Sequence, residues 1–161
     1  MQFLGLTIFG FGGMEIFSYL VHRFLFHGVF WRVHQTHHKP NKFFLELNDV
    51  FSLIFAVTSM SLMIFAEKPL LASLTFPIGL GIAIYGLVYF LIHDFFTHRR
   101  FLPFGSQNKI LLTIRAAHQR HHQSIEKPAL EPYGLFIFDY KRFFAANKKG
   151  RDPKIPSSKV V

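Results

Sequence analysis

The sequence predicts an all-α fold: an integral membrane helical bundle of about three to four transmembrane helices with a cytoplasmic, histidine-rich helical cap. Half of its 161 residues are hydrophobic and 22 are Phe, an unusual composition for a soluble chain of single-domain length. Three apolar stretches approach the roughly 20 residues that a helix needs to cross a membrane. Every histidine lies in one of the two polar segments that follow the first and third stretches.

The three expected spans are Phe3–Leu20, Val50–Ala66 and Leu70–Ile92. The first is interpreted as a retained helix because it has neither the basic start nor the small-residue cleavage site of a signal peptide. The second span is short, and Pro77 is expected to interrupt the third, as neighbouring groups in a membrane bundle allow. Only Glu67–Pro69 separates the second span from the third, which predicts a tight hairpin turn.

An odd number of spans places the long polar segments 21–49 and 93–161 on one side of the membrane. These segments contain 17 of the 18 Lys and Arg residues, and Lys68 is the exception. Basic residues collect on the cytoplasmic side, so the net charge of +9 indicates membrane topology and contact with anionic headgroups, and no nucleic acid partner. We expect a single membrane domain over residues 1–146 and a polar, basic, disordered tail over 147–161.

The ten histidines form two copies of one pattern, an H-x4-H pair followed by an H-x2-H-H triplet. The first copy is VHRFLFH with HQTHH, and the second is IHDFFTH with HQRHH. Clustered imidazoles repel one another when protonated and lack partners when buried and neutral, which favours metal binding. The absence of cysteine excludes thiolate and iron–sulfur sites. The predicted metal ligands are His22, His27, His34, His37, His38, His93, His98, His118, His121 and His122.

The spacing within each motif carries geometric information. Positions i, i+3 and i+4 share one face of an α-helix, so each triplet is expected to aim three imidazoles at one point. The two members of an H-x4-H pair, such as His22 and His27, would lie about 140° apart on a regular helix. Either a π-bulge or a helix end falls between them, or they serve different metal ions. We favour different metal ions.

The identity of the metal follows less directly from the residues. Neutral imidazole suits zinc, copper, iron or nickel, and ten ligands exceed what one ion can use, so two ions are implied. A structural zinc site needs only four ligands. Two ions at a membrane surface suit oxygen activation beside an apolar substrate, which favours iron over zinc.

Four polar residues are candidates for orienting imidazoles through the second ring nitrogen. Glu15 lies within the first span, two helical turns before His22 and on the same face, and an acidic residue inside a span is a functional candidate. Asp94 directly follows a histidine, and Asn48 and Asp49 begin the second span. Capping of a helix start is the alternative role for these last three residues.

The order of motifs resembles the bacterial β-carotene hydroxylases, the carotenoid 3-hydroxylases of the membrane fatty-acid hydroxylase superfamily. The resemblance covers roughly Gly13 to Gly134 and rests on VHRFLFHG, HQTHHKP, ELNDVFSLIFA, YGLVYFLIHDFFTHRR and AAHQRHH. The histidine set is shared by the wider superfamily, whereas the ND, YG and HD context points to the carotenoid branch. The sequence departs from the expected pattern at Glu131–Phe136, which bears on ring specificity.

The resemblance implies a di-iron centre, two iron ions cycling between Fe2+ and Fe3+, that uses O2 and electrons from a ferredoxin-type donor. The implied reaction adds hydroxyl at C3 of β-ionone rings, converting β-carotene through β-cryptoxanthin to zeaxanthin in the bacterial inner membrane. All ten histidines match family positions.

Three spans are few to enclose a long polyene, so a homodimer or a fourth helix is expected to complete the enclosure. Two other functions stay open. The first is a fatty-acid or sterol hydroxylase or desaturase with the same metal site. The second is a non-enzymatic metal-binding or metal-transport protein, which would place its ligands near the bilayer midplane.

Overall fold

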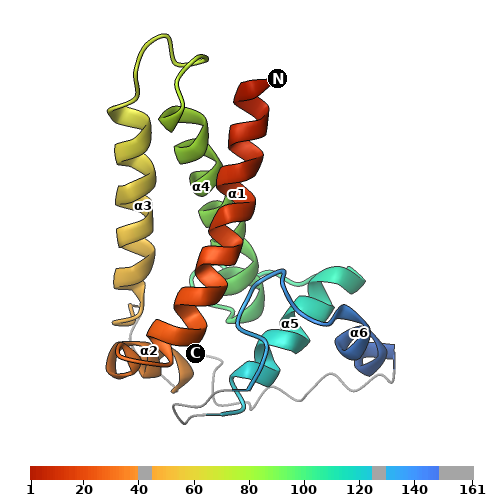
Figure 1. Ribbon diagram of the computed structural model, residues 1–161. Helices are drawn as coiled ribbons and strands as arrows, with labels where there is room; N and C mark the ends of the chain where they lie inside the picture. The colour runs from red at the N-terminus through yellow and green to blue at the C-terminus, as the bar shows by residue number, and fades with distance from the viewer. Residues whose placement is uncertain (40–44, 125–129, 149–161) are drawn as a thin grey trace.

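The computed structural model describes residues 1–39, 45–124 and 130–148. Three long helices stand side by side, and three short helices gather at one end of them (Figure 1). The long helices are α1 (Gln2–Leu20), α3 (Asp49–Ile64) and α4 (Thr75–Tyr89), and the short ones are α2 (Trp31–His38), α5 (Lys109–His121) and α6 (Tyr140–Lys148). The described residues contain no strand. The all-α prediction is therefore confirmed.

Two of the long helices continue without interruption into π-helical turns at the same end of the bundle. α1 runs into η1 (Val21–Phe26) and α4 runs into η2 (Phe90–Thr97). The combined segments, Gln2–Phe26 and Thr75–Thr97, are long and apolar enough to cross a membrane, and Asp49–Ile64 is a shorter apolar helix. The large apolar side chains on the outer faces are exposed, and the fold is a membrane helical bundle.

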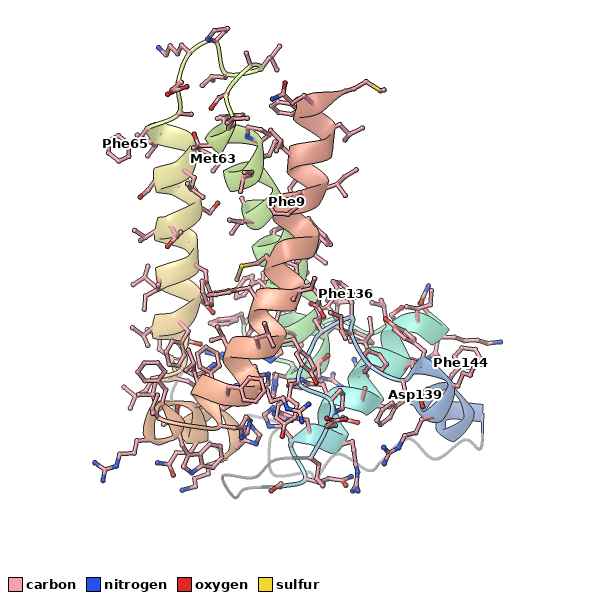
Figure 2. All side chains as sticks on the ribbon, viewed as in Figure 1. Phe9, Met63, Phe65, Phe136, Asp139 and Phe144 are labelled. Atoms are coloured by element: carbon pink, nitrogen blue, oxygen red, sulfur yellow. The ribbon has the colours of Figure 1, made fainter. Side chains whose placement is uncertain are left out.

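The connection between α3 and α4 differs from the expected tight turn. It spans residues 65–74, and α4 begins at Thr75, not at Leu70. Pro77 consequently lies in the first turn of α4 and does not interrupt the span. The first turn tolerates proline because its N–H groups have no partner within the helix. Figure 2 shows Met63 and Phe65 beside this connection, at the end of α3 that lies away from the short helices.

The middle helix of the bundle is α4, on which α1 and α3 both pack. A Cβ added to Gly10 of α1 would lie 2.5 Å from the Ile78 carbonyl oxygen of α4, so the two backbones meet with no room for a side chain. On the α3 side, the Ser59 hydroxyl donates a hydrogen bond of 2.8 Å to the Gly79 carbonyl. Between α1 and α3, both fully described, no Cα atoms lie within 8 Å.

Both histidine-bearing segments lie at the same end of the long helices, as the odd number of spans predicted (Figure 1). The tail expected from residue 147 onward lies outside the described residues, except that α6 ends at Lys148.

Candidate metal centre

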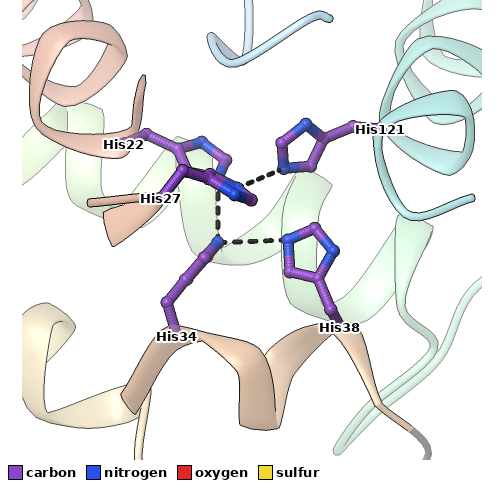
Figure 3. A group of neighbouring side chains, drawn as sticks. All are labelled: His22, His27, His34, His38 and His121. Atoms are coloured by element: carbon purple, nitrogen blue, oxygen red, sulfur yellow. Dashed lines mark hydrogen bonds between the residues drawn. The ribbon is translucent and has the colours of Figure 1, made fainter. Parts of the chain in front are cut away.

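Nine of the histidines form two compact groups where the long helices meet the short ones. Within each group, one nitrogen atom from every ring lies within 4.8 Å of those from the others. Group 1 consists of His22, His27, His34, His38 and His121 (Figure 3). Group 2 consists of His37, His93, His98 and His118.

The π-helical turns bring the members of each H-x4-H pair together. In η1 the His27 N–H donates to the His22 carbonyl at 3.1 Å, and in η2 the His98 N–H donates to the His93 carbonyl at 2.9 Å. An i→i+5 hydrogen bond makes five residues about one turn, so both rings face the same side. The expectation that the members of a pair serve different ions is wrong, because each pair belongs to one group.

The triplets behave in the opposite way, since each is divided between the groups. In α2, His34 and His38 belong to group 1, whereas the His37 Nε2 lies 3.1 Å from the His93 Nε2 of group 2. α5 likewise sends His121 to group 1 and His118 to group 2. The expectation that a triplet aims at one point is therefore wrong. α2 and α5 instead each contribute histidines to both groups.

The tenth histidine, His122, lies between the groups. Its ring stacks on that of His38 with centroids 4.3 Å apart and lies 4.7 Å from that of His37. Its Nε2 is buried without a hydrogen-bond partner among the described residues. A free nitrogen lone pair beside both groups makes His122 available as a further ligand.

The hydrogen bonds fix which ring nitrogen is available to a metal. The Nδ1 atoms of His22, His38 and His121 lie 2.7–3.0 Å from backbone carbonyl oxygens, which only accept, so each Nδ1 donates. A neutral imidazole that donates from Nδ1 has a lone pair on Nε2. The Nε2 atoms are the ones that converge within the groups.

The close approach of the Nε2 atoms in group 1 suits the binding of a cation. The His34 Nε2 lies 3.0 Å from that of His22 and 3.2 Å from that of His38 (Figure 3). Burial lowers the pKa of His34 to about 2 and that of His121 to about 3, so the rings are neutral near pH 7. Lone pairs that face one another across about 3 Å repel unless a cation lies among them. The donor set therefore fits a metal ion bound by imidazole nitrogens.

Predicted side chains contact the Nδ1 atoms of two imidazoles, those of His34 and His93. The His34 Nδ1 donates to the Asn48 Oδ1 at 2.7 Å, as expected for an orienting residue. Asp94 lies near its neighbour, with the His93 Nδ1 3.4 Å from its Oδ2. The Asn48 side chain makes no capping bond to α3, so its contact is with the histidine.

Two further residues at the site were not predicted. Glu46 accepts a hydrogen bond of 2.9 Å from the His37 Nδ1. Arg100 donates to both carboxylate oxygens of Asp49, at 3.0 and 2.7 Å, and to the Asp94 Oδ1 at 2.8 Å. Asp49 thus contacts Arg100, not an imidazole. In the sequence, Glu46 could have been noticed as the first residue of ELND, and Arg100 as the second arginine of THRR.

Three other histidines donate to backbone carbonyls, which sequence patterns cannot identify. His22 donates to Tyr133, His38 to Ser124 and His121 to Leu130. All three carbonyls lie in the chain that follows α5.

Glu15 does not orient His22, contrary to expectation. Its Oε1 accepts hydrogen bonds of 2.8 Å from the backbone N–H groups of Phe136 and Ile137, and its Oε2 accepts one of 2.7 Å from the Tyr85 hydroxyl. Figure 2 shows Phe136 beside α1. Glu15 therefore holds the segment after Tyr133 against α1, and reaches His22 only through the carbonyl of that segment.

An apolar cavity of about 350 Å³ leads to group 2. It is bounded by α1, α3 and α4, and His93, Asp94 and Arg100 line its polar end. Tyr89 lines the same cavity and stacks on His93 with ring centroids 4.4 Å apart. The cavity therefore offers an apolar space that reaches His93 at one end and lies among the long helices at the other.

Fold and site together define a class, that of helical membrane proteins with paired histidine clusters able to hold metal. The chain belongs to the fatty acid hydroxylase family, whose model matches residues 7–144.

Several named proteins are similar to the chain in sequence. The chain is 41% identical over 129 residues to "Beta-carotene 3-hydroxylase 2, chloroplastic" of Arabidopsis thaliana, covering 78% of this chain and 42% of that protein. It is 33% identical over 155 residues to "Beta-carotene hydroxylase" of Pseudescherichia vulneris (91% and 84%), and 35% identical over 125 residues to the protein of that name in Pantoea ananas (76% and 70%). The chain thus spans about two fifths of the plant relative and most of the bacterial ones. No solved structure matches it significantly.

Proposed function

We propose that this protein is a di-iron monooxygenase that adds hydroxyl at C3 of carotenoid β-ionone rings, converting β-carotene through β-cryptoxanthin to zeaxanthin. The observation that carries the proposal is the pair of all-histidine groups, one of which reaches the polar end of an apolar cavity through His93. The names of the plant and bacterial relatives supply the substrate class.

Group 1 would hold one iron ion and group 2 the other, with His122 available between them. Bound iron would supply the activation of O2, the co-substrate. The chain supplies the positioning: Nδ1 hydrogen bonds hold the imidazoles of His22, His34 and His37 with their Nε2 atoms toward the ion. The apolar cavity positions one C–H bond of the substrate and excludes water from the site.

The setting of the reaction is part of the proposal. We assign the protein to the bacterial inner membrane with the histidine groups at its cytoplasmic face, because 17 of the 18 Lys and Arg residues lie in the segments on that side. A soluble, ferredoxin-type donor would deliver electrons there. A homodimer would help to enclose the far end of a long polyene.

Expression in a bacterial host that accumulates β-carotene tests the reaction. We expect β-cryptoxanthin and zeaxanthin in pigment extracts after aerobic growth with iron, and unchanged β-carotene from a His37→Ala control. That control removes a group 2 ligand without touching the cavity wall. Absence of hydroxylated carotenoid from the wild-type protein, expressed at normal levels, would contradict the substrate. Hydroxylated or desaturated fatty acids or sterols in the same extracts would instead favour a fatty-acid or sterol hydroxylase or desaturase, in line with the family's name.

A further inference from the structure

A groove runs along the bundle between α1 and α3, with α4 as its floor, because both helices pack on α4 while their Cα atoms stay more than 8 Å apart. The groove contains two cavities. The inner cavity, of about 350 Å³, is the one that reaches His93. The outer cavity, of about 400 Å³, lies farther from the histidines and includes Phe9, Gly13 and Thr58 among its walls.

The two cavities adjoin each other. Met14, Phe55 and Ile82 line both of them, one residue from each long helix. These three side chains therefore mark the boundary between the two cavities. The Phe17 ring meets the Phe55 ring edge-on, with centroids 6.0 Å apart, and joins α1 to α3 at the same level.

Resting on the proposed function, we propose that the outer cavity is a binding subsite for the unreacted apolar chain of the substrate, while the reacting ring occupies the inner cavity. Between Phe9 and His22, α1 rises about 20 Å, which suits a long, rigid hydrocarbon lying along the groove. Phe9 and Ile54 line the outer cavity and are 66% and 52% exposed, so the subsite opens toward the membrane interior, where such a substrate dissolves.

Gly13 sets the width of this subsite. It lines the outer cavity, and a Cβ added to it would meet no atom within 4 Å, so the space beside it belongs to the groove. A large side chain at this position fills the subsite without striking the backbone. Gly12 provides a matched control, because its added Cβ also meets nothing within 4 Å while it lines neither cavity.

The test compares Gly13→Phe with Gly12→Phe in the full-length, iron-loaded protein, reconstituted in lipid vesicles that contain β-carotene. Both variants replace a glycine of α1 by the same residue, so changes in helix propensity cancel. We expect Gly13→Phe to raise the KM for β-carotene about tenfold or more relative to Gly12→Phe, because it removes chain binding shared by the ground and transition states. Iron content is expected to be equal in both.

A KM for Gly13→Phe within twofold of that for Gly12→Phe, at equal iron content, would overturn the subsite and leave the outer cavity to lipid chains. If Gly13→Phe fails to accumulate with iron, Thr58→Phe narrows the same cavity from α3 and takes its place in the comparison. Failure of the proposed function can be distinguished from failure of the subsite, because in the former case the wild-type protein would hydroxylate no β-carotene in the same assay.

Discussion

Replacement of His34 by alanine is expected to abolish hydroxylation, by at least about 100-fold, and to remove one of the two proposed metal ions. His34 is 2% exposed, and its Nε2 lies within 3.2 Å of those of His22 and His38. The substitution removes a central imidazole of group 1 and its hydrogen bond to the Asn48 side chain. Product formation and metal content of the purified variant measure the two effects.

Gln35→Ala is the matched control for His34→Ala. Gln35 is the next residue of α2, and its side chain makes exposed hydrogen bonds to the Arg32 carbonyl and the Lys39 ammonium group. We expect it to keep activity and metal content within about twofold of the wild type, as surface substitutions usually do. Activity of His34→Ala equal to that of Gln35→Ala would remove His34 from the ligand set.

Replacement of Arg100 by alanine is expected to have the next largest effect, a loss of metal affinity and activity of about 10–100-fold. Arg100 neutralises carboxylates that contact histidines of group 2: it pairs with Asp94 at 2.8 Å and lies 3.7 Å from Glu46. Without the guanidinium these carboxylates, together with Asp49, repel one another and release His37 and His93. Iron titration and turnover of the purified variant provide the measurement.

Arg99→Ala and Arg100→Lys separate charge from geometry. Arg99 is exposed and adjacent to Arg100, so its loss changes net charge equally and should have little effect. Lysine at position 100 keeps the charge but cannot donate from a planar fork to both oxygens of Asp49, so partial recovery is expected. Equal losses in Arg99→Ala and Arg100→Ala would reduce the role of Arg100 to net charge.

The histidine spacing predicted the clusters but not how they divide. An H-x4-H pair is compatible with a π-turn or with two separate ions, and local sequence does not distinguish these alternatives. The π-turns η1 and η2 settle the matter because they put both members of a pair on one side. Division of each triplet follows from the placement of α2 and α5 between both groups, which only the tertiary structure defines.

Long-range contacts explain the other differences. Glu15 and His22 share a helix face, yet Glu15 bonds to Phe136 and Ile137, residues far away in the sequence. For Asn48 the sequence left open orientation of an imidazole and capping of a helix start, and only the tertiary structure shows its side chain in contact with His34. The carbonyls of Tyr133, Ser124 and Leu130 carry no side-chain signature and could not be predicted.

The metal content of the purified wild-type protein, measured by elemental analysis after iron-replete expression, tests the two-group metal centre most directly. Two histidine groups joined by shared helices predict two iron ions per chain, falling to about one in His34→Ala as group 2 keeps its own ligands. A single ion per chain in the fully active wild-type protein, or full activity without bound iron, would contradict the account.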